Sequence, residues 1–104
     1  MDETIQDQLK IFKAFNDETR LRVLEQLRGG EKCASDLLGN LDCLQSGLSY
    51  HMKILVESGI VEERPAGKWT HYRLSKSGSV MAMALIEQLT TPAPNVHEIK
   101  CCEN

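Results

Sequence analysis

The residues with the most distinctive chemistry in this chain are two neighbouring cysteines, Cys101 and Cys102, in the stretch "IKCCEN". Thiolates are the ligands that soft, thiophilic ions prefer. An adjacent pair closes a strained ring if it is oxidised to a disulfide, because the peptide bond between the two residues prefers to be planar and trans. Lys100 beside the pair favours the thiolate form. The pair is therefore a candidate ion-binding site, and a pair of thiols without a role is the alternative.

Cys33 and Cys43 bring the number of cysteines to four. The stretch "MDETIQDQLK" lacks the basic start and apolar core of a signal peptide, and no apolar run approaches the roughly 18 residues that span a bilayer. We therefore expect a cytoplasmic protein without membrane contact, where free thiols ligate metals or sense oxidants more often than they form disulfides. Cys33 and Cys43 are candidate third ligands beside the pair, and packing residues are the alternative for both.

The elements that must position these thiols follow from the apolar pattern. Spacing predicts helices over residues 5–15, over a stretch that follows a cap at Asn16 and ends at Gly29, and over 33–41, 45–58 and 75–89. Their apolar stripes are Ile5, Leu9, Phe12 and Phe15; Leu21, Leu24 and Leu27; Leu37, Leu38 and Leu41; Leu48, Met52 and Leu55; and Val80, Met81, Ala84, Leu85 and Leu89.

Two β-branched and aromatic runs, "IVEER" and "WTHYRL", predict a two-stranded hairpin joined through Pro65, Ala66 and Gly67, with Arg64 and Lys68 at its tip. The expected fold class is therefore mainly α with a small β-hairpin, an α+β arrangement. A chain of 104 residues suits one domain. We place the domain at residues 1–91, with residues 92–104 as a tail that carries the cysteine pair.

The predicted helices 33–41 and 45–58 suit a helix-turn-helix, whose second helix enters the major groove of DNA. The second helix carries side chains that bond base edges or neutralise phosphate rather than acidic ones. A net charge of −3 argues against non-specific polyanion binding but does not exclude DNA. Plain packing of a helix pair is the alternative.

Three segments, "NDETRLRVL", "SYHMKILVESGIV" and "GKWTHYRL", stand in the order and spacing of the ArsR/SmtB family of winged helix-turn-helix repressors, which the chain resembles from about Leu9 to Ile86. The resemblance implies a homodimer joined by the first and last helices and bound to an inverted-repeat operator in double-stranded DNA. It places the DNA contacts on the recognition helix and the wing, at Gln45, Ser46, Ser49, Tyr50, His51, Lys53, Arg64 and Lys68, with His71 as a further candidate.

Three of the aromatic side chains in these segments have a structural alternative. His51 shares part of its helix face with the apolar stripe, so a hydrogen-bonded structural role competes with DNA contact. Trp69 and Tyr72 are able to stack on nucleic acid, but in a strand pattern they are more often packing residues, and we assign them to packing.

The resemblance also bears on the ion site. Arsenic-responsive members carry "CVCDL" before the recognition helix, where this chain reads "CASDL". Cys33 thus holds the first thiol position, but Ser35 and Leu38 hold the next two, and neither is a thiolate ligand. Zinc-responsive members use Asp, His and Glu of the last helix, where this chain offers Glu87. Neither familiar site is expected, which leaves Cys101 and Cys102.

Trivalent arsenic is pyramidal and takes three ligands, so two thiolates leave one place for Cys33, Cys43, solvent or a carbon substituent on the arsenic. We predict a repressor of an arsenic-resistance operon, without a required cofactor, that leaves DNA when arsenite or an organic arsenical such as methylarsenite binds Cys101 and Cys102. The alternative is a thiol-based redox sensor or a cadmium- or lead-responsive repressor of the same family. No Cys-x-x-Cys motif or phosphate loop is present, so an enzyme is not expected.

Overall fold

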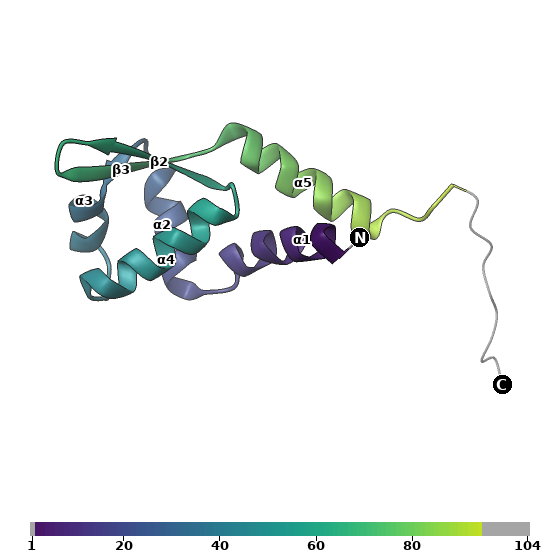
Figure 1. The fold of residues 1–104 in the computed structure, drawn as a ribbon, viewed down its shortest axis with the longest axis horizontal. Helices are drawn as coiled ribbons and strands as arrows, with labels where there is room; N and C mark the ends of the chain where they lie inside the picture. Colours follow the sequence, from purple (N-terminus) through teal and green to yellow (C-terminus); the bar gives the residue numbers. More distant parts are fainter. Residues whose placement is uncertain (1, 95–104) are drawn as a thin grey trace.

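The computed structural model describes residues 2–94, and this part of the chain contains five helices and one three-stranded antiparallel sheet (Figure 1). The elements are α1 (Asp2–Phe15), α2 (Glu18–Leu27), β1 (Lys32–Cys33), α3 (Ala34–Gly39), α4 (Gln45–Glu57), β2 (Val61–Ala66), β3 (Trp69–Leu74) and α5 (Lys76–Thr90). Helices α2, α3 and α4 form the body of the fold, and the β2–β3 hairpin extends from it as the wing. The predicted fold class is confirmed.

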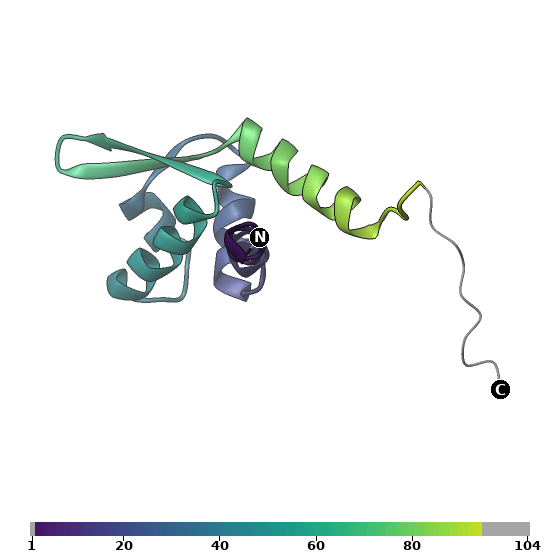
Figure 2. The ribbon, with the colours of Figure 1, turned by 45° about the vertical axis from the view of Figure 1, so that its right-hand side comes forward.

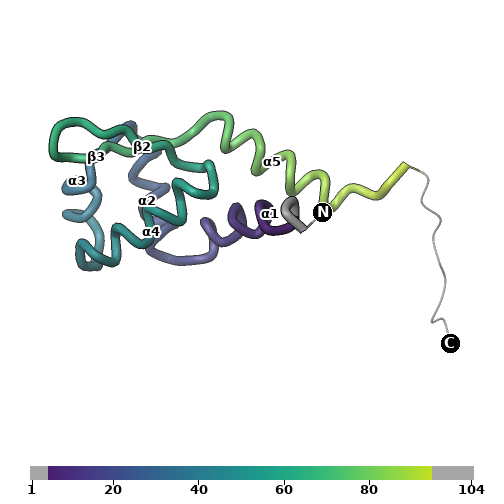
Figure 3. Tube along the Cα trace, in the orientation of Figure 1, coloured from purple at the N-terminus to yellow at the C-terminus, as the bar shows by residue number. Residues whose placement is uncertain are grey.

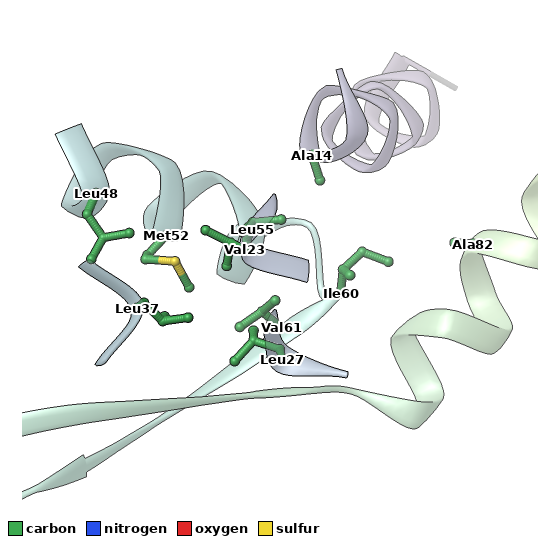
Figure 4. Packing of buried hydrophobic residues seen from close by; sticks show 10 residues of the cluster. All are labelled: Ala14, Val23, Leu27, Leu37, Leu48, Met52, Leu55, Ile60, Val61 and Ala82. Atoms are coloured by element: carbon green, nitrogen blue, oxygen red, sulfur yellow. The ribbon is translucent and has the colours of Figure 1, made fainter. Parts of the chain in front are cut away.

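The core lies where α4 meets α2, α3 and the base of the wing (Figure 4). Leu48, Met52 and Leu55 of α4 are at most 3% exposed, as the periodicity predicts. They pack with Leu37 of α3 and with other buried side chains of α2 and β2. Burial of each such side chain stabilises the fold by about 1.5–3 kcal/mol, so the inner face of α4 is anchored to the body of the fold.

Helix α2 begins and packs differently from the prediction. Its N-cap is Asp17 rather than Asn16, because the Asp17 carboxylate accepts the backbone N–H of Arg20 at 3.1 Å. Arg20, Val23 and Leu27 form the buried face, while Leu21 is 50% exposed. A leucine counted into the core stripe therefore lies on the surface, and an arginine takes a place in the interior.

Most of the side chains in the stripes of α1 and α5 face outward in this single chain. Ile5 and Leu9 of α1 are each 53% exposed, and the residue of α1 in the core is Ala14. In α5, Ala82 and Leu85 are buried, whereas Val80, Met81 and Leu89 are more than half exposed. Helix α5 leaves the base of the wing and projects away from the body (Figure 2).

The sheet has a strand that the sequence did not predict. Lys32 pairs with Tyr72 and Cys33 with His71, so β1 takes the free edge of β3 and the strand order is β1-β3-β2. Cys33 thus lies in a strand and precedes α3 instead of starting a helix. Pro65 also lies in a strand and pairs with Thr70. Proline is tolerated there because β2 is an edge strand.

The chain turns tightly at the ends of α4 and the wing, as the tube in Figure 3 traces. The hairpin turn is short, with Gly67 at φ +66° between the paired residues Ala66 and Trp69. Gly59 (φ +86°) ends α4, and its carbonyl lies directly against Gly78 at the start of α5.

No helix within residues 2–94 combines the length and the apolar character needed to cross a bilayer.

Candidate functional site

The outer face of α4 presents the side chains expected to read DNA. Five of them are exposed, and they are Gln45, Ser46, Ser49, Tyr50 and Lys53. Because the opposite face is anchored in the core, these side chains have a defined direction. The first turn of α4 carries no acidic residue. Hydroxyl and amide groups on such a surface are able to bond base edges, and the lysine is able to neutralise a phosphate.

His51, also predicted on this face, is held on the inner side of it. Its side chain is 15% exposed, and its Nδ1 lies 2.8 Å from Nη1 of Arg20 and 3.7 Å from Oδ2 of Asp17. A guanidinium only donates hydrogen bonds, so Nδ1 is the acceptor and the proton of the neutral ring is on Nε2. The structure therefore favours the structural interpretation of His51 over direct DNA contact.

Arg20 is a buried partner of His51 that sequence reasoning missed. It is 5% exposed, and its guanidinium also donates to the carbonyls of Lys13 at 2.9 Å and Ala14 at 3.3 Å. One side chain thus contacts the end of α1 and the middle of α4 from α2. Its place three residues before Val23 and seven before Leu27, both in the core, was the signal that pointed inward.

The wing holds its cations differently from one another. Lys68 follows Gly67 in the hairpin turn and is exposed. Arg64 lies within β2, opposite His71 of β3. Its guanidinium binds the carboxylate of Glu31, with Nε 3.4 Å from Oε1 and Nη2 paired with Oε2. Nδ1 of His71 lies 3.4 Å from the same Oε2. The Arg64 hydrogen bond lowers the pKa of Glu31 and raises that of Arg64. Arg64 is therefore not at the tip, and its charge is matched by Glu31.

The wing and α4 share a concave surface. A hollow of about 270 Å³ is lined by Ser49 and Lys53 of α4 together with Tyr72 and Glu63 of the wing. Tyr72 packs against the core, and burial raises the pKa of its hydroxyl. Trp69 is 52% exposed beside the turn, so its assignment to packing is wrong for this chain alone. Ser49 and Lys53 of α4 thus lie next to the wing.

The thiols divide into two described and two undescribed residues. Cys33 is half-buried, and its Sγ lies 3.1 Å from Oγ of Ser35. Cys43 is half-buried and packs on the core. Cys101 and Cys102 lie outside the described residues. Within residues 2–94, no three His, Cys, Asp or Glu side chains gather closely enough to hold a metal ion.

Comparison with protein families matches residues 17–63 to the family described as "Bacterial regulatory protein, arsR family". The arsenical resistance operon repressor of Escherichia coli (strain K12) is 41% identical over 81 residues, which cover 77% of this chain and 69% of that protein. The arsenical resistance operon repressor of Bacillus subtilis (strain 168) is 36% identical over 80 residues, covering 72% and 76%.

Solved structures share the fold. A possible transcriptional regulator for arsenical resistance superposes with a TM-score of 0.69 at 29% identity, covering 77% of this chain and 82% of that one. A homodimeric winged helix-turn-helix DNA-binding domain from Mycobacterium bovis, a possible ArsR-family regulator, superposes with a TM-score of 0.66 at 22% identity, covering 93% of each chain.

Proposed function

The chain belongs to the ArsR family of bacterial regulatory proteins, and on this premise we propose that it is a cytoplasmic, homodimeric repressor of an arsenic-resistance operon. It binds an inverted-repeat operator and leaves it when trivalent arsenic binds Cys101 and Cys102. The DNA-binding part of this proposal is supported by α4, whose outer face is polar and exposed, whose inner face packs in the core, and which lies beside the wing. The family is one of DNA-binding regulators rather than enzymes.

The proposed DNA contacts divide by chemistry. Gln45, Ser46 and Ser49 lie toward the amino end of α4, the part of a recognition helix that reaches base edges, and they provide sequence preference. Lys53 farther along α4 and Lys68 in the wing contact the phosphate backbone, and Tyr50 is exposed enough to reach either. Arg64 contributes less, because Glu31 matches its charge.

The second copy in the proposed dimer covers the apolar surfaces of α1 and α5. Besides the exposed stripes, an open groove of about 960 Å³ lies between α2 and α5, lined by Phe15, Leu21, Leu24, Met83 and Ile86 among others. Exposed apolar side chains on α1 and α5, together with this groove, suit an interface with a second copy. A two-fold dimer also matches the two half-sites of an inverted repeat.

The proposed inducer follows from the relatives and the thiols together. Two relatives are arsenical resistance operon repressors, so arsenic is the expected effector class. The "CASDL" segment offers one sulfur: Cys33 faces the hydroxyl of Ser35 at 3.1 Å, and a hydroxyl is a poor soft-ion ligand. The tail pair therefore supplies two thiolates, and the third ligand of arsenite comes from Cys33, Cys43 or solvent. An organic arsenical such as methylarsenite brings its own third substituent and needs no further thiol.

The test measures release of a fluorescent duplex, selected from random sequence by the wild-type protein, as arsenite or methylarsenite is added. We expect the double variant Cys101→Ser with Cys102→Ser to bind the duplex normally but to resist release by both arsenicals. The matched control, Cys33→Ser with Cys43→Ser, should keep its response to methylarsenite and lose response to arsenite only if one of these residues is the third ligand. Unchanged release from the tail variant would refute the site.

The alternative is a thiol redox sensor or a cadmium- or lead-responsive repressor of the same family. It is supported by the same thiols, since soft ions and oxidants share this chemistry. The same duplex assay with cadmium, lead and hydrogen peroxide in place of the arsenicals separates these effectors. Mass spectrometry of the peroxide-treated protein then identifies any oxidised cysteine.

A further inference from the structure

The contacts of Arg20 link three helices through one buried cation. The guanidinium donates to two carbonyls at the end of α1, to Nδ1 of His51 on α4, and it sits on α2. The last carbonyls of a helix lack partners within that helix, and Arg20 bonds two of them: that of Ala14, and that of Lys13, which also accepts the backbone N–H of Asn16 at 3.2 Å. The apolar stripe of α1 belongs to the surface assigned to the second copy, and the outer face of α4 to the surface assigned to DNA. Arg20 therefore joins the two proposed interfaces.

We infer that the Arg20–His51 hydrogen bond is a positioning contact, which sets the orientation of the recognition helix relative to the dimer helix α1. The inference rests on the proposed function, because it concerns how the two recognition helices are presented to DNA. Neither residue needs to touch a base. The effect passes from the end of α1 through the guanidinium to the imidazole, and from there to the backbone of α4.

The contact depends on the protonation state of His51. The neutral ring accepts from Arg20 through Nδ1, whereas a protonated ring has only N–H donors and carries a charge that Arg20 repels. The groups that face the ring are Asp17 and Arg20 of α2 and the edge-on ring of Tyr50, whose centroid lies 5.3 Å away. Asp17, 3.7 Å from Nδ1, is the acceptor available to a protonated ring. Protonation thus exchanges Arg20 for Asp17 as the partner of His51.

Asp17 is poised to take this role. Desolvation raises the pKa of its carboxyl, but the backbone N–H of Arg20 and the nearby His51 and Arg20 outweigh that effect and lower the pKa overall. The carboxylate is therefore charged throughout the range in which histidines ordinarily titrate.

The test compares two variants of His51 in the full chain. His51→Asn keeps an acceptor oxygen at the position of Nδ1, whereas His51→Leu keeps the bulk and removes the acceptor. With the selected duplex we expect His51→Leu to bind about tenfold more weakly and His51→Asn to stay near the wild type. Sedimentation equilibrium should give the same dimer dissociation for all three, which a general loss of structure would not. Equal duplex affinity for His51→Leu and the wild type would overturn the inference.

Long-range ¹H–¹⁵N spectra of the free protein separate this inference from the proposed function. They should show Nδ1 of His51 unprotonated at neutral pH, and a protonated Nδ1 would overturn the inference without reference to DNA. A wild-type protein that selects no duplex would instead overturn the proposed function and, with it, the positioning role.

Discussion

The recognition helix and the wing face the same hollow, but they hold their polar side chains in different ways. On α4, among the described residues, Lys53 makes no ion pair, although it lines the hollow together with Glu63. In the wing, Arg64 is paired with Glu31 and Arg73 with Glu62. We therefore expect DNA to replace water on the outer face of α4, whereas most of the wing's positive charge already has a partner.

The largest expected effect concerns the joint between these regions, where Gly59 follows α4 and Gly78 lies in the first turn of α5. A Cβ on Gly78 would lie 1.9 Å from the carbonyl oxygen of Gly59, which is backbone and cannot move aside cheaply. We expect Gly78→Ala to lower the free energy of unfolding by about 3 kcal/mol or more, measured by urea denaturation.

Gly39→Ala is the matched control for this change. Gly39 is in a helix, and a Cβ there meets no heavy atom within 4 Å. Alanine should therefore stabilise α3 by up to about 1 kcal/mol. An unchanged free energy of unfolding for Gly78→Ala would mean that the end of α4 and the start of α5 are not in fixed contact.

The second prediction removes the proposed base contacts of α4. Ser46→Ala with Ser49→Ala should weaken binding to the selected duplex by about 0.5–1.5 kcal/mol for each hydrogen bond to a base that is removed, and should relax sequence preference. Both residues are exposed in a helix, where alanine is well tolerated, so stability should be kept. The measurement is a titration against the selected duplex and a scrambled one. Equal weakening on both duplexes would place these serines on phosphate instead.

The sequence predicted α4 better than it predicted the contacts of the wing and of the interior. The recognition helix followed from local pattern, because Leu48, Met52 and Leu55 recur at helical spacing and the polar residues fall between them. The partners of His51 and Arg64 did not, because they lie 31 and 33 residues away and depend on how the elements pack. Strand β1 was missed for the same reason: two residues have no period, and they become a strand only beside β3.

The helices at the two ends of the described chain show a further limit. Apolar spacing correctly predicted a stripe on each of α1 and α5, but it does not reveal which molecule covers the stripe. Leu9 and Met81, both more than half exposed, have the same hydrophobic signature as residues buried within the chain. Trp69 was misplaced likewise, since strand propensity cannot distinguish an aromatic residue packed under a sheet from one standing at its end.

The third prediction tests whether the wing's charge is matched, through a cycle on Glu31 and Arg64. Glu31→Gln should strengthen duplex binding a few-fold at low salt, because it frees Arg64, and Arg64→Ala should weaken it by uncovering the carboxylate. The double variant should return close to the wild type, as expected for coupled neighbours. Lys68→Ala should instead lower the salt dependence by about one charge. The effect of Lys68→Ala should be the same in the presence of Glu31→Gln. Rescue of Lys68→Ala by Glu31→Gln would contradict the independence of Lys68 from the Glu31–Arg64 pair.

The pH dependence of the same pair has a definite sign. The hydrogen bond from Arg64 lowers the pKa of Glu31 from its ordinary 4.5. The contribution of the pair to stability is therefore fully present above pH 4.5 and disappears as the pH falls through the lowered pKa. Acid unfolding curves of the wild type and Glu31→Gln should accordingly diverge above that range and converge below it.

The smallest expected effect lies at the start of α4, where Leu44 occupies the N-cap with its side chain 79% exposed and without a capping hydrogen bond. Serine at this position accepts a backbone N–H of the first turn, so Leu44→Ser should stabilise the protein by about 0.5–2 kcal/mol in thermal or urea unfolding.

An uncapped leucine there costs stability, and an apolar side chain at the amino end of a recognition helix is suited to contact a thymine methyl group. A more stable variant with reduced preference for one A·T position of the selected duplex would extend the reading surface of α4 beyond its polar side chains. A more stable variant with unchanged preference would confine that surface to the polar face, and an unchanged stability would show that the first turn gains nothing from a side-chain cap.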